Sequence, residues 1–264
     1  MTFSFSEQTR ARAKELVARY PAGRERSALL PLLHLVQSEQ GYVSADGITF
    51  CAETLGLTKA QVAAVASFYT MDKRRPTGDW LVSVCTNTMC GVLGGDKTFD
   101  TLKEHLGVGH DQTTEDGVFT LEHAECLAAC DYAPVMTVNY EYFDKVQAGD
   151  AVRIVEQLRG GERPAPDRGA RLCPLKEMSL QLAGFADERE GALGDGPAGE
   201  PTLAGVRLAD RHGISVPGFD PETPITQRAP EQQPGHRRPE TVPEPAADRK
   251  PAGEAPAAEK RSVE

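Results

Sequence analysis

Apolar positions in the first seventy residues recur at the three- and four-residue spacing of a single helix face. Three stretches each place four such residues at i, i+3, i+4 and i+7: residues 13–20, 29–36 and 62–69. This spacing is typical of helices that bury one side and expose the other. The sequence therefore predicts an N-terminal helical bundle, which we assign to residues 1–75.

Residues that suit helix ends flank these stretches. Ser27 is placed to cap the start of the second helix and Gly41 to end it. Thr58, followed three residues later by Gln61, has the spacing of a capping box for the third helix. A further short helix is expected over residues 45–55, after Ser44.

The pattern changes from helical to strand-like after residue 76. Short β-rich apolar runs at 80–84, 118–121 and 135–138 predict strands, and helical patterns lie at 99–106 and 151–158. The predicted order is β-α-β-β-α, a small α/β layer within residues 76–160. The fold class expected is therefore α+β, a helical bundle followed by an α/β domain.

Composition separates residues 161–264 from the rest of the chain. Fifteen of the 19 prolines lie there, but only two of the 16 aromatic residues, Phe185 and Phe219. We expect this Pro/Ala/Gly/Glu-rich extension to be mostly disordered, above all over residues 187–264, because it buries too little to offset its ordering entropy. Residues 171–185 are an exception: they form either a short helix that docks on a neighbour or a plain linker.

Charge and hydropathy exclude several classes of protein. No apolar run approaches the roughly 18 residues that span a bilayer, and residues 1–20 lack the apolar stretch of a secretory signal. We expect a soluble, intracellular chain without direct membrane insertion. The formal charge of −10 and the lack of a basic patch argue against nucleic acid as a partner.

Four cysteines, Cys85, Cys90, Cys126 and Cys130, make up the strongest chemical motif. Each pair follows or precedes a predicted strand, so that the four thiols converge on one sheet edge if the strands are neighbours. Four thiolates together would repel one another unless a positively charged centre balanced them. The pattern therefore indicates a metal site.

The spacing leaves three kinds of site open. Pairs with four and three intervening residues suit a [2Fe–2S] cluster modestly better than a tetrahedral zinc ion. The lack of a C-x-x-C motif argues against a thiol–disulfide enzyme. Three glycines after the first pair either bring backbone amides close to a cluster or simply make a turn: Gly91, Gly94 and Gly95. Three acidic residues near the second pair would lower the reduction potential of a cluster bound there: Glu122, Glu125 and Asp131.

Other reactive or apolar residues have plainer interpretations. Cys51 is expected in the core and Cys173 as an idle thiol of the extension. His123 is expected to hydrogen-bond near the second cysteine loop rather than to bind metal. The run of Phe68, Tyr69 and Met71 is expected in the core by its helical spacing, with a partner-docking patch as the alternative.

The runs at 67–71, 84–90 and 125–134, with Gly-Tyr-Val-Ser at 41–44, resemble the thioredoxin-like [2Fe–2S] ferredoxins of bacterial NADH:quinone oxidoreductase (complex I). The resemblance extends from about residue 6 to 158. It implies a helical bundle followed by a thioredoxin-like domain, and one [2Fe–2S] cluster bound by all four cysteines. This chain departs from the family's pattern at two places. Gly91 and the residues after it stand where family members often have Met-Leu-Arg-Gly, and Asp72 stands where an aromatic residue often follows Tyr-Thr-Met.

The same resemblance implies an electron-transfer subunit in the NADH-oxidising module. FMN and NADH would be bound by a neighbouring flavin subunit, and the other partners would be further peripheral-arm subunits. The location implied is the cytoplasmic side of the inner (cell) membrane. The chain would act as an enzyme only within the complex, since it shows no complete active site of its own. The alternative is the equivalent subunit of an NAD-linked formate dehydrogenase or soluble hydrogenase.

Overall fold

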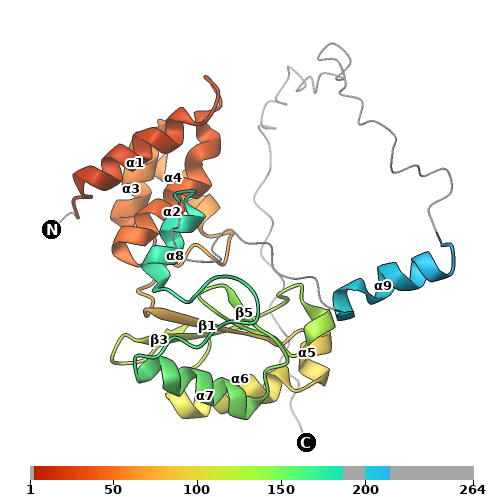
Figure 1. The fold of residues 1–264 in the computed structure, drawn as a ribbon. Helices are drawn as coiled ribbons and strands as arrows, with labels where there is room; N and C mark the ends of the chain where they lie inside the picture. The colour runs from red at the N-terminus through yellow and green to blue at the C-terminus, as the bar shows by residue number, and fades with distance from the viewer. Residues whose placement is uncertain (1–2, 187–199, 215–264) are drawn as a thin grey trace, which may run out of the picture. The chain divides into compact units, whose positions relative to one another are not determined.

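The computed structural model describes residues 3–186 and 200–214, and its N-terminal part is helical (Figure 1). The helices of this part are α1 (Glu7–Ala18), the 3-10 helix η1 (Glu25–Ala28), α2 (Leu29–Gln40), α3 (Ala45–Leu55) and α4 (Lys59–Ala66). Their apolar faces share one core, in which Leu32, Leu33 and Val36 of α2 are fully buried. The predicted helical bundle is confirmed.

Three of the predicted helix ends are also present. Gly41 ends α2 in the left-handed conformation, at φ 85°. The Ser44 hydroxyl accepts the Gly47 N–H at 3.0 Å at the start of α3, and Thr58 with Gln61 forms the capping box of α4. These side chains satisfy backbone N–H groups that the first turn of a helix leaves without a partner.

Two predicted boundaries are wrong. Ser27 does not cap α2, because it lies inside η1, which runs directly into the helix with Ala28 already in a helical conformation. A side-chain cap needs a non-helical backbone at the capping residue. The third helix ends at Ala66, where the Phe68 N–H bonds the Val65 carbonyl in a tighter turn, so Tyr69 lies beyond α4.

The described residues contain a five-stranded sheet in the order β2-β3-β1-β4-β5. Its strands are β1 (Trp80–Cys85), β2 (Gln112–Thr113), β3 (Phe119–Ala124), β4 (Met136–Val138) and β5 (Glu141–Phe143). β1 and β3 run parallel, whereas the other neighbours are antiparallel. The three predicted strands are confirmed. β2 and β5, two and three residues long, are too short to show a period of their own.

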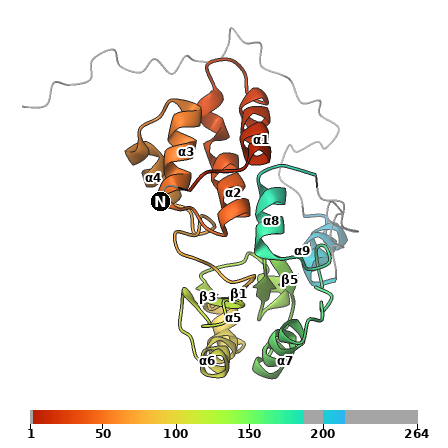
Figure 2. The ribbon, with the colours of Figure 1, turned by 90° about the vertical axis from the view of Figure 1, so that its left-hand side faces the viewer.

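Two helices, α6 (Gly95–Leu106) and α7 (Ala148–Arg159), lie side by side on one face of the sheet (Figure 2). α6 provides the crossover that the parallel pair β1 and β3 requires. Leu102 of α6 and Val155 of α7 pack with Phe119 of β3 in a second apolar core. Two short helices, α5 (Thr88–Val92) and the 3-10 helix η2 (Cys130–Tyr132), follow β1 and β3. The α+β fold class is confirmed.

Of the two alternatives for residues 171–185, the structure shows the docking helix: it is α8 (Leu175–Leu182), and it docks on α2. The Gln37 amide donates to Ser179 Oγ at 3.2 Å inside this contact, and Ala183 joins the bundle core. Cys173, expected as an idle thiol, is buried. The chain therefore contributes to the fold well past residue 160, and domain boundaries near 75 and 160 stay a prediction.

Part of the tail that we expected to be disordered is helical. Residues 200–211 form α9 (Glu200–Arg211), with Pro201 in the first turn, where a proline is tolerated. The rest of that tail, 187–199 and 215–264, lies outside the described residues. Among the helices described, none combines the length and the apolar content that crossing a bilayer requires.

Candidate metal centre

The first cysteine pair lies where β1 passes into α5. Cys85 is the last residue of β1, and the Asn87 side chain caps α5 by accepting the Thr88 N–H at 2.8 Å. This cap starts the turn of helix that brings Cys90 back beside Cys85, and the two residues share one small buried cluster. Both cysteines are buried, with 3% and 2% of their surface exposed.

The second cysteine pair follows β3. Cys85 lies opposite Ala124, the last residue of β3, so both pairs come from the carboxyl ends of neighbouring parallel strands. Ala128, at φ 54°, bends the loop, and its N–H donates to Cys126 Sγ at 3.4 Å. Cys130 then opens η2. In contrast to the first pair, both thiols of the second pair are exposed.

The two pairs meet at this edge of the sheet. Cys85 Sγ lies 3.9 Å from the Glu125 carbonyl oxygen, which precedes Cys126. Cys130 interacts electrostatically with Cys126 and with Cys85, and Cys90 interacts with Cys85 and Cys130. Within the described ranges, no three Cys, His, Asp or Glu side chains converge tightly enough to enclose a single ion. The Cys85–Cys90 pair and the Cys126–Cys130 pair lie next to each other at the ends of β1 and β3.

This donor set fits a centre of two metal ions. A [2Fe–2S] cluster is held by four cysteines shared between two irons, whereas a structural zinc draws four ligands around one ion. Burial, followed by the neighbouring Cys85 thiol, raises the pKa of Cys90 to about 11. Although Cys130 is exposed, partial loss of water around its thiol, followed by the charge of Cys126, also raises the pKa of Cys130. A positively charged centre would displace these protons and balance the thiolates.

Gly95 allows the start of α6 to lie directly against the backbone of the first pair. A Cβ atom on Gly95 would lie 2.4 Å from Cys85 O and 2.9 Å from Cys90 O, closer than real Cβ contacts. Gly94, at φ 109°, makes the turn before it. A helix N-terminus with bare amides favours a negatively charged neighbour. Of the three predicted glycines, Gly95 is thus the one that lies against the backbone of the first cysteine pair.

A tyrosine and an arginine that the sequence analysis missed support the second cysteine loop. Tyr142 Oη donates to the Leu127 carbonyl at 2.8 Å. Arg168 lies over the rings of Tyr142 and Tyr132, 4.6 and 5.0 Å from their centroids, and pairs with Asp144 at 2.5 Å. Because β5 is short and Arg168 lies in the Pro-rich extension, no periodic pattern marks either residue.

Glu122 and His123, two of the predicted neighbours of the loop, are held by structural contacts. Glu122 pairs with Lys73 and accepts a hydrogen bond from Ser83 Oγ at 2.6 Å, so its charge is balanced inside the protein. His123 Nδ1 lies 3.4 Å from Thr86 Oγ1, one residue after the first cysteine. This contact agrees with the expected hydrogen bond near the loop.

The remaining candidates divide between core and surface. Cys51 is fully buried in the bundle, and burial, followed by the charge of Asp72, raises its pKa to about 12, as suits the expected core residue. The expected core role of Phe68 and Tyr69 is wrong, since 78% and 46% of their surface is exposed. Both follow the end of α4, so the helical face on which that expectation rests does not reach them.

The chain is similar to several known proteins. Residues 13–159 match the family model described as thioredoxin-like [2Fe-2S] ferredoxin. A Mycobacterium tuberculosis protein, named as a subunit of NADH-quinone oxidoreductase, is 57% identical over 205 residues, covering 78% of this chain and 80% of that protein. NADH dehydrogenase [ubiquinone] flavoprotein 2, mitochondrial, of Dictyostelium discoideum is 34% identical over 161 residues, covering 61% and 65%. A solved NAD+-reducing [NiFe]-hydrogenase matches at a TM-score of 0.46 and 20% identity, over 50% of this chain and 23% of that one.

Proposed function

Because this chain belongs to the thioredoxin-like [2Fe–2S] ferredoxin family, we propose that it carries one such cluster as the corresponding subunit of a respiratory NADH:quinone oxidoreductase. Its role there is electron transfer within the NADH-oxidising module. The proposed ligands are Cys85, Cys90, Cys126 and Cys130. The observation that carries the proposal is the meeting of these thiols as two pairs at the carboxyl ends of the parallel strands β1 and β3.

The two cysteine pairs differ in their exposure to solvent. Cys85 and Cys90 are buried and exclude water from one side of it, while Cys126 and Cys130 lie at the surface. When bound, the cluster takes up and releases a single electron. The amides at the start of α6, brought close by Gly95, offset negative charge there. The exposed pair leaves one side open for a partner chain, so electron exchange is proposed on that side.

The partner proposed for this exchange is the flavin- and NADH-binding subunit of the same complex. FMN and NADH belong to that subunit, because this sequence carries neither a dinucleotide fingerprint nor a P-loop. The chain therefore takes part in the enzyme without an active site of its own. Other peripheral-arm subunits complete its surroundings, on the cytoplasmic side of the inner (cell) membrane.

The relatives favour this complex over an NAD-linked formate dehydrogenase or soluble hydrogenase. The Mycobacterium relative is named for NADH-quinone oxidoreductase, and the Dictyostelium relative for NADH dehydrogenase. Subunits that purify with the full-length chain, identified by mass, test this choice. A formate-oxidising or hydrogen-oxidising subunit among them would contradict the respiratory assignment.

The cluster itself is tested with the purified full-length chain. We expect a brown protein with about two irons per chain, visible absorption, and a rhombic electron-spin resonance signal after dithionite. Cys126→Ala should abolish or strongly destabilise the cluster, whereas the matched variant Cys51→Ala, in the bundle core, should keep it. A colourless protein with one zinc per chain, or an unchanged spectrum in Cys126→Ala, would contradict the ligand assignment.

A further inference from the structure

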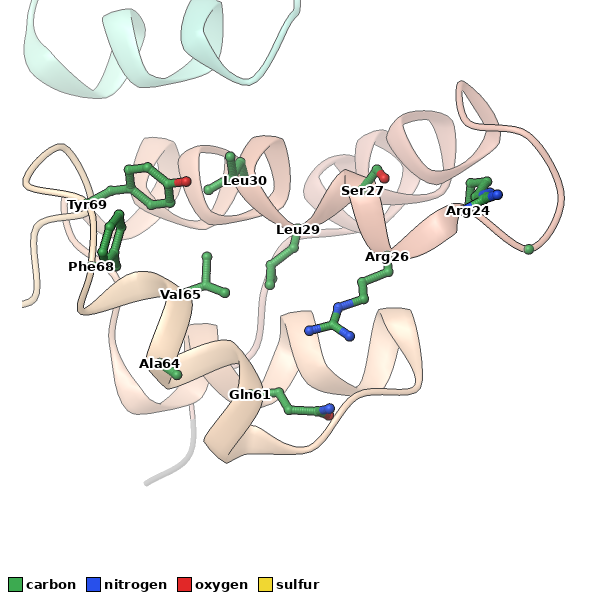
Figure 3. A pocket seen from close by; sticks show the side chains of 11 residues that line it. Arg24, Arg26, Ser27, Leu29, Leu30, Gln61, Ala64, Val65, Phe68 and Tyr69 are labelled. Carbon is green, nitrogen blue, oxygen red and sulfur yellow. The ribbon is translucent and has the colours of Figure 1, made fainter. Parts of the chain in front are cut away.

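A groove of about 860 Å³ crosses the N-terminal bundle. One wall comes from η1 and the start of α2. The other comes from α4 and from Phe68 and Tyr69, which follow α4 (Figure 3). Its volume lies in the range of sites that bind ligands in other proteins. None of the six cysteines lines it, so the groove is distinct from the candidate metal centre.

The two ends of the groove differ in chemistry. Phe68 and Tyr69 lie at one end, beside Leu30, and the side chains of Arg26 and Arg24 lie toward the other (Figure 3). Val65 and Leu29 form apolar surface between them. A ligand that follows the groove therefore meets an aromatic end and a basic end.

Three large apolar side chains are exposed next to one another at the aromatic end. Phe68, Tyr69 and Leu30 are 78%, 46% and 39% exposed, and the two rings meet edge to face with centroids 5.0 Å apart. Isolated exposed apolar residues are ordinary, but three along one groove mark an interaction site. Large aromatic side chains are also the residues that most often anchor protein interfaces.

The basic end offers two unpaired cations. Arg24 and Arg26 are exposed, and neither side chain makes a hydrogen bond, an ion pair or a ring contact with any residue the structure describes. They stand out in a chain whose formal charge is −10. Arginine binds a carboxylate through paired N–H donors, which gives both strength and direction.

We propose that this groove seats a segment of a partner polypeptide that carries a large apolar side chain at one end and a carboxylate side chain at the other. The apolar group packs against Phe68 and Tyr69, and the carboxylate pairs with Arg26 or Arg24. A polypeptide is the fitting occupant because a small molecule would leave the protruding Phe68 ring largely uncovered. The partner is another subunit of the same complex, so the inference rests on the proposed function. In the complex, the groove would attach this chain to that subunit at a site separate from the cysteine loops.

The test uses the full-length chain in its assembled complex, with Phe68→p-benzoylphenylalanine as a light-activated cross-linker. We expect one cross-linked partner peptide that contains Asp or Glu. Arg26→Glu should reduce the cross-link about tenfold, because it replaces an attraction for the carboxylate by a repulsion at the basic end of the groove. The matched control Arg75→Glu reverses an exposed arginine outside the groove and should leave the yield unchanged. An unchanged cluster spectrum in each variant shows that the fold is intact.

Each alternative outcome is distinct. A cross-link to a second copy of this chain, to its own C-terminal residues, or to no polypeptide would overturn the groove proposal, as would an equal effect of both charge reversals. If NADH-oxidising subunits purify with the chain but no cross-link forms, the groove proposal fails alone. If no such subunits purify with it, the proposed function fails first.

Discussion

Tyr142 ties the loop of the second cysteine pair to the sheet, because its hydroxyl donates to the Leu127 carbonyl at 2.8 Å. Leu127 directly follows Cys126, and Tyr142 belongs to β5, at the far end of the strand order from β2. Arg168 covers the tyrosine ring and also bonds β5 through its carbonyl, which accepts the Tyr142 N–H at 3.2 Å. The exposed half of the metal centre is therefore supported by residues outside the cysteine motif.

Removing this hydrogen bond should loosen the loop without changing which residues bind the cluster. We expect Tyr142→Phe to weaken the closed loop by about 1 kcal/mol, and so to speed cluster loss roughly fivefold. The measurement is the decay of visible absorption in the presence of an iron chelator. Tyr69→Phe removes the hydroxyl of an exposed tyrosine outside the cysteine motif and serves as the control. Equal decay rates in the two variants would contradict the role of Tyr142.

Adding one methyl group at Gly95 should disturb the cysteine backbone. The new Cβ would overlap Cys85 O and Cys90 O, so we expect Gly95→Ala to destabilise the fold by about 3 kcal/mol and to lower iron content. Gly149→Ala is the matched control, since Gly149 also lies in the first turn of a helix but a Cβ added to it would meet no atom within 4 Å. It should be neutral or stabilising by up to about 1 kcal/mol. Thermal unfolding and iron analysis of both variants decide the matter.

Asp72 should make the stability of the bundle depend on pH. Its side chain is buried, Oδ2 has no hydrogen-bond partner among the described residues, and burial raises its pKa to about 6. A carboxyl group with a raised pKa in the fold stabilises the protein while protonated, and this contribution is lost as pH rises from about 4 through 6. Besides burial, the charge of Asp72 also raises the pKa of Cys51, which is buried, and of Tyr140, which is half-buried.

Neutralising Asp72 should remove this dependence. We expect Asp72→Asn to stabilise the chain more at pH 8 than at pH 5, by roughly 1 kcal/mol of difference. The measurement is the thermal midpoint from circular dichroism at both pH values and one scan rate. Asp100→Asn, an exposed aspartate of α6, should shift both midpoints equally. An equal shift at both pH values for Asp72→Asn would contradict an ionised, buried carboxylate.

Two truncations separate the tail from the folded part of the extension. A chain that ends at residue 186 keeps α8 and Arg168, and we expect it to retain the cluster spectrum. A chain that ends at residue 166 loses the contact of α8 with α2 and the support of Tyr142, and we expect it to lose iron and unfold at lower temperature. Loss of iron from the longer form would show that residues after 186 belong to the fold.

The sequence alone predicted the elements whose signals are local. The capping box of Thr58 and Gln61 and the end of α2 at Gly41 depend only on neighbouring backbone groups. The position of the cysteines at strand ends followed in the same way from short β-rich runs. The ligand assignment of the four cysteines stays a prediction, which the meeting of the two pairs supports.

Tertiary structure decided what depends on residues far apart in the chain. Gln37 and Ser179 are 142 positions apart, and their contact makes α8 part of the bundle rather than of a linker. Phe68 has the large apolar side chain that is typical of a core residue, yet it lies at the surface because α4 ends before it. Spacing along a chain reports which face of one element a residue occupies. Whether another element covers that face is settled only when the elements pack together. The same packing decides the burial of Cys173, the hydrogen bond from Tyr142 to Leu127 and the open groove.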